Sequence, residues 1–482
     1  MGKANRIAAL ILAALMLAGS PVQAQSDLPE LGDAAGVDLS LRTERRIGQE
    51  IMNEIRQREP SYLDDPEIEA YLNQLGGRLV AASPEPGLGF YFFPLQDPMI
   101  NAFAMFGGYV GVNSGLVLAV QNESELAGVL AHEISHVTQR HLARILEKQK
   151  QVSTASLLAM AAALLAARSN ADLAGAAMTS ATAGAAQAQL GFSRDFEREA
   201  DRVGFQILEK AGFDVRSMST FFARLQRATR SYENNAPVYL RTHPLNVERI
   251  SDMQNREVEL PYRQVPDSMD FHLVRAKLQA MRGTPVEAES HFRTLLQEQK
   301  AAPVWAAQYG LAVALARQKN WRDAEQVLAE VRGKRALSPM IERLYAESRI
   351  HRGDVSGGLA VLKEALGRFP NASALVYSYA ELLLQAGRLE EAQRFLDAQV
   401  QRTSQDDRLY LLQAKVHAAR GRFAQQHRAL AEAYLLRGQL PAAIEQLEIA
   451  QKVKGTDFYE LSAIDARLRQ LKRRQQDEAK DK

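Results

Sequence analysis

The pentapeptide His132-Glu133-Ile134-Ser135-His136 has the residue types and the spacing that a metal-dependent hydrolase needs. It matches the pattern H-E-x-x-H, with two histidines four residues apart. On a helix, residues i and i+4 lie on the same face, so both imidazoles can point at one metal ion. Glu133, beside the first histidine, can reach a water in the site and act as its base. The pattern predicts the centre of a zinc peptidase.

A buried helix is predicted around this pentapeptide. Asn122 is the expected N-cap, and Glu125 stands three residues later in a capping-box arrangement. Polar side chains on a buried helix face are costly unless they are paired or bind a metal. This cost favours a metal site over the alternative, two core histidines with satisfied hydrogen bonds. The apolar residues at helical spacing are Leu126, Val129, Leu130, Ile134 and Val137.

A third metal ligand must be an oxygen or nitrogen donor, because the chain contains no cysteine. The best candidate segment is residues 192–201, where Glu197 and Asp201 share a helix face at i and i+4. Glu197 can bind the metal while Asp201 accepts a hydrogen bond from the N–H of a ligand imidazole. Spacing alone also leaves Glu199 open as the ligand. The alternative to both is a charged, solvated helix face.

These motifs together resemble the gluzincin family of HtpX and the CAAX-prenyl proteases. The resemblance also rests on three further segments and covers roughly residues 40–255. It implies the zinc ligands His132, His136 and Glu197, the base Glu133, a supporting Asp201 and a His243 close to the metal. The further segments are Asn101-Ala102-Phe103-Ala104, Gly107-Gly108-Tyr109-Val110 and Thr242-His243-Pro244 with Arg249.

His243 precedes Pro244, which restricts it to extended geometry, so we expect it in a stiff loop. Near zinc, its imidazole could donate a hydrogen bond to the oxyanion that forms during attack, aided by Arg249. It could instead take the fourth zinc position and hold the enzyme latent, which is the hypothesis that we favour. The remaining alternative is a histidine that only packs.

The N-terminus predicts a secretory signal peptide, residues 1–24, and the alternative is an uncleaved interfacial anchor. Lys3 and Arg6 precede an apolar run, residues 7–17, which is too short to span a bilayer. Export to the periplasm follows from this prediction. A chain without cysteine forms no disulfides there, so its cores must hold the fold. The formal net charge is +2, and both excess charges belong to the signal, so nothing indicates nucleic-acid binding.

Residues 25–262 are predicted to form an α+β zincin-like metalloprotease domain, mostly helical with a small sheet. Residues 41–82 have helical periodicity, whereas residues 88–120 have strand character, and Gly107-Gly108 indicates a bulge or a close backbone approach. We expect the strand that precedes the metal helix to offer the free edge to which an extended substrate adds, and the alternative is an ordinary core strand. The alanine-rich segment 153–190 is predicted to be a helical hairpin that could cover the site, touch a membrane or client, or simply pack.

Residues 266–476 are predicted to form an all-α tetratricopeptide-type solenoid, and the alternative is an irregular helical bundle. Lys319, Gly353, Gly387 and Gly421 follow one another at intervals of 34 residues, the period of this repeat. Gly438 comes only 17 residues after Gly421, which suggests that one helix serves two neighbouring hairpins. Solenoids of this kind present a concave binding surface. The charged tail after Leu471 is expected to be disordered.

The sequence therefore predicts a periplasmic zinc endopeptidase joined to a partner-binding solenoid. By the resemblance, the partners are unfolded or misassembled outer-membrane proteins and the β-barrel assembly machinery, with misfolded proteins degraded. The alternative is a chaperone or adaptor whose protease is largely latent.

Overall fold

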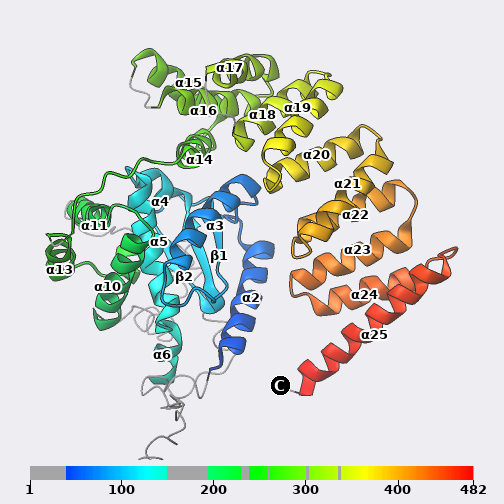
Figure 1. Ribbon diagram of the computed structural model, residues 1–482, viewed down its shortest axis with the longest axis horizontal. Helices are drawn as coiled ribbons and strands as arrows, with labels where there is room; N and C mark the ends of the chain where they lie inside the picture. Colours follow the sequence, from blue (N-terminus) through cyan, green and yellow to red (C-terminus); the bar gives the residue numbers. More distant parts are fainter. Residues whose placement is uncertain are drawn as a thin grey trace, which may run out of the picture. The chain divides into compact units, whose positions relative to one another are not determined.

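The computed structural model describes residues 39–148, 194–229, 238–258, 260–299, 303–334 and 338–480 (Figure 1). The predicted signal peptide and the predicted hairpin of segment 153–190 lie outside these ranges. The described chain is mostly helical with one small sheet, followed by paired helices, which confirms the predicted fold class. None of its helices has the length and apolar character needed to cross a membrane.

The first part of the chain combines the small sheet with helices (Figure 1). The helices predicted within residues 41–82 are confirmed, and the strands predicted within residues 88–120 are confirmed up to Asn113, whereas Ser114–Ala119 form a helix instead. The elements are α2 (Leu41–Arg58), α3 (Pro66–Ala81), β1 (Tyr91–Leu95), β2 (Ala102–Ala104), η2 (Phe106–Gly108), β3 (Tyr109–Asn113), α4 (Ser114–Ala119), α5 (Glu123–Thr138), α6 (His141–Lys148), α10 (Arg194–Lys210), α11 (Arg216–Thr229), α12 (Val238–Thr242) and α13 (Val247–Val258).

The sheet has the strand order β1-β3-β2. Strand β3 is central, parallel to β1 and antiparallel to β2, with Phe103 opposite Gly111. The prediction that the strand preceding the metal helix offers a free edge is therefore wrong, because β1 and β2 cover both sides of β3. Strand β2 is the edge strand that contacts α5. The reversal at η2 causes this order, since it folds β2 and β3 into a hairpin.

Gly107 and Gly108 make the reversal at η2 possible, because both have left-handed φ angles, 72° and 83°. A Cβ at Gly107 would lie 2.6 Å from the Cα of Arg45, and one at Gly108 would lie 2.2 Å from the carbonyl oxygen of Gly89. Only glycine fits two such approaches without strain. The predicted close backbone approach is confirmed.

The second part of the chain is a series of helical hairpins (Figure 1). The register residues of the predicted repeat all end the first helix of a hairpin with a left-handed φ: Lys319 at 61°, Gly353 at 93°, Gly387 at 69° and Gly421 at 70°. This shared conformation explains why the repeat favours glycine there. The elements are α14 (Met269–Ala280), α15 (Pro285–Gln297), α16 (Val304–Arg317), α17 (Trp321–Lys334), α18 (Pro339–His351), α19 (Val355–Arg368), α20 (Ser373–Gln385), α21 (Leu389–Arg402), α22 (Asp407–Ala419), α23 (Phe423–Leu436), α24 (Leu440–Gln451) and α25 (Phe458–Lys480).

The largest hydrophobic core runs from Leu63 in the first part to Leu344 in α18. It includes the metal helix α5 and the first repeat helices, so apolar packing continues across residues 262–266, where we predict the boundary between two domains. Two smaller cores follow among the later repeats. The site helix and the first repeats are thus stabilised by the same apolar contacts.

The prediction of a disordered tail after Leu471 is wrong for the residues up to Lys480, which continue α25. Ile464, Leu468 and Leu471 are buried in the last core and fix the helix against its neighbours. Beyond them, Arg474 Nε lies 2.8 Å from Glu478 Oε1 one turn later, an ion pair that supports a solvated helix.

Candidate metal centre

Helix α5 carries the pentapeptide in the interior of the protein. Its N-cap is Asn122, whose side chain accepts a hydrogen bond from Glu125 N, whereas the Glu125 carboxylate returns to Gln121 N instead of completing a capping box. His132 and Glu133 are completely buried and His136 is 1% exposed. The Nε2 atoms of the two histidines lie 3.0 Å apart, as expected for neighbours at i and i+4 that face one point.

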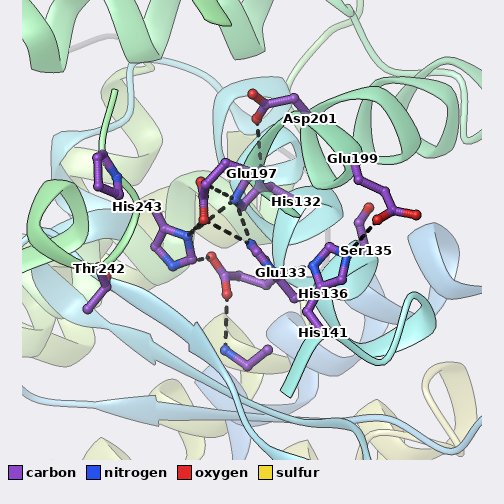
Figure 2. Close-up of polar contacts among 12 residues, drawn as sticks. His132, Glu133, Ser135, His136, His141, Glu197, Glu199, Asp201, Thr242 and His243 are labelled. Carbon is purple, nitrogen blue, oxygen red and sulfur yellow. Dashed lines mark hydrogen bonds and ion pairs between the residues drawn. The ribbon is translucent and has the colours of Figure 1, made fainter. Parts of the chain in front are cut away.

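Helix α10 brings Glu197 to the same point (Figure 2). Its carboxylate lies 3.5 Å from His132 Nε2 and 3.6 Å from His136 Nε2. A Cβ at Gly204 would lie 3.1 Å from the backbone nitrogen of His132, so this glycine lets α10 pack closely on α5. Local spacing left the choice between Glu197 and Glu199 open, and the packing of α10 on α5 directs Glu197 at the histidines.

His243 completes the cluster from the loop that follows α12, as expected of a residue before proline (Figure 2). Its Nδ1 lies 3.0 Å from Glu197 Oε1 and 3.4 Å from His132 Nε2. Tyr239, one turn earlier and completely buried, stacks on the imidazole with ring centroids 4.7 Å apart. One donor atom from each of His132, His136, Glu197 and His243 lies within 4.8 Å of all the others.

Asp201 and Arg249 support this cluster from behind. Asp201 Oδ1 lies 3.0 Å from His132 Nδ1, on the ring edge opposite the cluster. Arg249 donates to both Asp201 oxygens at 2.6 and 2.8 Å, and its Nη1 also lies 2.7 Å from Glu197 Oε2. The suggestion that Arg249 could aid an oxyanion is therefore wrong, because its guanidinium is buried among these two carboxylates and the Pro244 carbonyl. Its role is to hold Glu197 and Asp201 in place.

Glu133 lies between the cluster and the sheet. Its Oε2 accepts a hydrogen bond from Ala104 N of strand β2 at 3.0 Å, and its Oε1 lies 3.6 Å from His243 Nε2. Burial raises the pKa of the Glu133 carboxyl above its usual value, although His243 and His132 oppose this shift. A carboxylate with a raised pKa holds a proton more readily at neutral pH, which suits a general base.

Burial and neighbouring charges shift the pKa values of the cluster's groups in different directions. Burial alone would raise the pKa of Glu197, but His243 and His132 outweigh it and lower that pKa well below 4.5. Burial alone would lower the pKa of His132, but Asp201 and Glu197 raise it to about 9. Burial and the neighbouring His132 lower the pKa of His136 well below 6.5. Arg249 already pairs with the Glu197 carboxylate, so the indication of a metal site is the close approach of three imidazoles and one carboxylate in the interior of the protein.

A family model described as peptidase family M48 matches residues 66–257, and one described as a tetratricopeptide repeat matches residues 349–416. The putative beta-barrel assembly-enhancing protease of Vibrio cholerae is 34% identical to this chain, over 94% of each protein. The chain belongs to peptidase family M48. The beta-barrel assembly-enhancing protease of Escherichia coli is 33% identical over 98% of this chain and 97% of its own length.

A more remote relative, the mitochondrial metalloendopeptidase OMA1 of Schizosaccharomyces pombe, is 32% identical over 45% of this chain and 62% of that protein. Among solved structures, the tetratricopeptide-repeat protein YrrB covers 38% of this chain at 13% identity with a TM-score of 0.29. The resemblance to a gluzincin metalloprotease followed by repeats is confirmed, and the chain is a metalloprotease whose cluster can hold a metal ion.

Residue spacing did not reveal all the groups around this cluster. His141 is completely buried beside His136, and its only signal in the sequence is its position soon after the pentapeptide. The pairing of Arg249 with Asp201 joins residues 48 positions apart, which no local spacing indicates. Glu199, the alternative ligand, contacts His141 and Arg144 instead of the cluster.

Proposed function

We propose that this chain is a zinc-dependent endopeptidase of the periplasm that cleaves unfolded or misassembled outer-membrane β-barrel proteins. The observation that supports the proposal most strongly is the buried cluster of three nitrogen donors and one carboxylate, with Glu133 beside it and the edge strand β2 next to Glu133. These are the parts that a metallopeptidase needs: a metal site, a base and a surface for an extended peptide.

The donor set fits zinc, which prefers imidazole nitrogen and carboxylate oxygen in tetrahedral sites. His132, His136 and Glu197 would hold the ion. The buried atoms Glu133 Oε1 and Glu197 Oε2 accept no hydrogen bond within the described residues, although Arg249 forms an ion pair with the latter. Buried carboxylate oxygens without such partners are costly unless a cation is near. Zinc, when bound, polarises the scissile carbonyl and makes a water more acidic.

Glu133 is the proposed general base and acid. Its Oε2 is held by Ala104 N, which leaves Oε1 to take a proton from the attacking water and pass it to the leaving amine. Because the Ala104 amide belongs to β2, the base is positioned by the same strand that would bind the substrate. One oxygen of Glu133 is thus bound to the proposed substrate-binding strand, and the other is left for proton transfer, which links catalysis to substrate binding.

Strand β2 is the proposed substrate-binding edge. Asn101 O accepts a hydrogen bond from β3 and Met105 N donates one to it, and Phe103 lies opposite Gly111. The backbone N–H and C=O groups of the odd-numbered residues therefore point toward β3. The peptide groups of Ala102 and Ala104 alternate with them and face the other way, toward Glu133 in the case of Ala104 N. Because Glu133 accepts the hydrogen bond of Ala104 N, a substrate could add there as an extended strand through the other main-chain groups of this edge, with little dependence on its side chains. This property suits an enzyme that removes unfolded proteins.

The proposed clients and compartment rest on the names of the relatives and on the N-terminus. Relatives that span nearly the whole chain are named beta-barrel assembly-enhancing proteases. The predicted signal peptide would deliver the protein to the periplasm. The repeats provide surfaces for other proteins, and we propose that they bind these clients or the assembly machinery.

The test is cleavage of a chemically unfolded outer-membrane β-barrel protein by the purified, zinc-loaded full chain. Glu133→Gln should keep its zinc and lose about 10²- to 10⁴-fold in cleavage rate. Equal cleavage by this variant would refute the proposed mechanism. If wild type and variant both cleave negligibly, yet both promote barrel assembly equally, the adaptor alternative is correct.

A further inference from the structure

The turn between α5 and α6 contains an unusual backbone conformation. Arg140 has a φ of 52°, a left-handed value that costs a non-glycine residue roughly 1 kcal/mol or more. An ion pair holds it there, because the Arg140 guanidinium donates twice to Glu44 Oε1, at 2.9 and 2.6 Å. Both partners are largely buried. A strained residue with a dedicated partner suggests that the direction of the following chain matters.

The turn returns His141 to the metal helix. Five residues beyond His136 on a continuous helix, a side chain would point about 140° away from it. After the left-handed residue, His141 is instead completely buried, with its Nδ1 2.9 Å from the Nδ1 of His136 (Figure 2). Its ring stacks on Phe196, with centroids 4.5 Å apart and planes 15° apart.

If His136 binds a metal, the ring protons of His136 and His141 can be placed in one consistent arrangement. Nε2 of His136 faces the cluster, so it must be unprotonated to bind a metal, and the ring proton then lies on Nδ1. That proton can be donated only to an acceptor, so Nδ1 of His141 must be unprotonated as well. The neutral His141 ring therefore carries its proton on Nε2, which lies 3.2 Å from Glu199 Oε2.

Glu199 fixes this arrangement because an ionised carboxylate only accepts hydrogen bonds. Arg144 Nη1 donates to the same Oε2 at 2.9 Å and holds the carboxylate in place. The hydrogen bonds thus run in one direction: His136 Nδ1–H donates to His141 Nδ1, and His141 Nε2–H donates to the Glu199 carboxylate. Asp201 occupies the corresponding place for the other histidine of the pentapeptide, because its carboxylate lies against Nδ1 of His132.

We propose that His141, with its tautomer fixed by Glu199, is a positioning residue that holds the metal ligand His136 in its Nδ1–H form and in its ring orientation. The inference rests on the proposed metal site. Partners that orient a ligand histidine typically contribute 10- to 100-fold in metal affinity. Loss of the His141 acceptor removes the 2.9 Å contact at His136 Nδ1, which favours the Nδ1–H tautomer, and so favours the tautomer that cannot bind.

The experiment compares zinc affinity of full-length variants by chelator competition. His141→Phe preserves the stacking on Phe196 and removes the acceptor, and should weaken zinc binding about 10- to 100-fold. Glu199→Leu should weaken it about 10-fold, whereas Glu199→Gln should restore it, because an amide oxygen still accepts from His141 Nε2–H. Glu209→Leu, at an exposed position of the same helix, is the matched control.

Two further measurements separate positioning from a general loss of structure. The metal-free Glu199→Leu and Glu199→Gln variants should unfold at the same temperature while their zinc affinities differ. Nitrogen-15 NMR of the zinc-loaded wild type should show the proton of His141 on Nε2. A proton on Nδ1, or zinc affinity unchanged by His141→Phe, overturns the inference.

A final variant separates this inference from the proposed metal site. His136→Ala should abolish tight zinc binding. If it does so while His141→Phe does not weaken zinc binding, only the positioning role is refuted. If His136→Ala keeps the zinc affinity of the wild type, the proposed metal site itself is wrong, and the positioning role fails with it.

Discussion

Glu67 on α3 should make the free energy of unfolding depend on pH, and the substitution Glu67→Gln should remove this dependence. Glu67 is 5% exposed, and its carboxylate contacts two repeat helices. Lys277 Nζ of α14 lies 2.5 Å from Oε2, and Arg343 Nε of α18 lies 2.5 Å from Oε1. Burial alone would raise the pKa of Glu67, but Arg343 and Lys277 outweigh it and lower this pKa from 4.5 to about 2.

The shift gives the sign and size of the effect. A depressed pKa in the folded state stabilises the fold above pH 4.5, and this contribution is lost as the pH falls toward 2. At about 1.4 kcal/mol per pKa unit, the ionised carboxylate contributes about 3 kcal/mol at pH 7. Roughly half of it, about 1.5 kcal/mol, should remain at pH 3. Glu67→Gln, which resembles the protonated acid, should therefore destabilise the protein most at neutral pH.

Urea unfolding followed by tryptophan fluorescence can measure this loss. The chain has two tryptophans, Trp305 in α16 and Trp321 in α17, and both pack against the core that contains α3, α14 and α18. The free-energy difference between wild type and Glu67→Gln should shrink from about 3 to about 1.5 kcal/mol between pH 7 and pH 3. Glu330→Gln, at an exposed position of α17, is the control. A difference that stays constant with pH would refute the depressed pKa.

Three further predictions concern the metal centre. Glu197→Gln should lose most bound metal in elemental analysis, whereas Glu199→Gln should keep it. The opposite result would make Glu199, and not Glu197, the metal ligand. Asp201→Asn should lower zinc affinity by about 10- to 100-fold in chelator competition, because the carboxylate that faces His132 Nδ1 becomes neutral. His243→Ala should raise basal proteolysis and self-cleavage with zinc still bound by three ligands; lower activity would favour oxyanion stabilisation, and unchanged activity would favour packing alone.

The sequence alone determined the features that depend on short spacing. The geometry of one helix places His132, Glu133 and His136 together, and this requires no knowledge of the rest of the fold. The repeat period likewise identified Lys319 and its glycine counterparts, because one left-handed residue recurs wherever a hairpin turns. Glycine spacing also indicated the close approach at Gly107 and Gly108.

Only the tertiary structure decided the features that depend on how distant segments pack. Which acidic residue of α10 faces the histidines depends on the contact at Gly204, so spacing could not separate Glu197 from Glu199. The edge strand depends on sheet order, which follows from the reversal at η2 rather than from proximity in the chain. His141 reaches His136 through one left-handed residue, and a single backbone angle of this kind leaves no periodic pattern in a sequence.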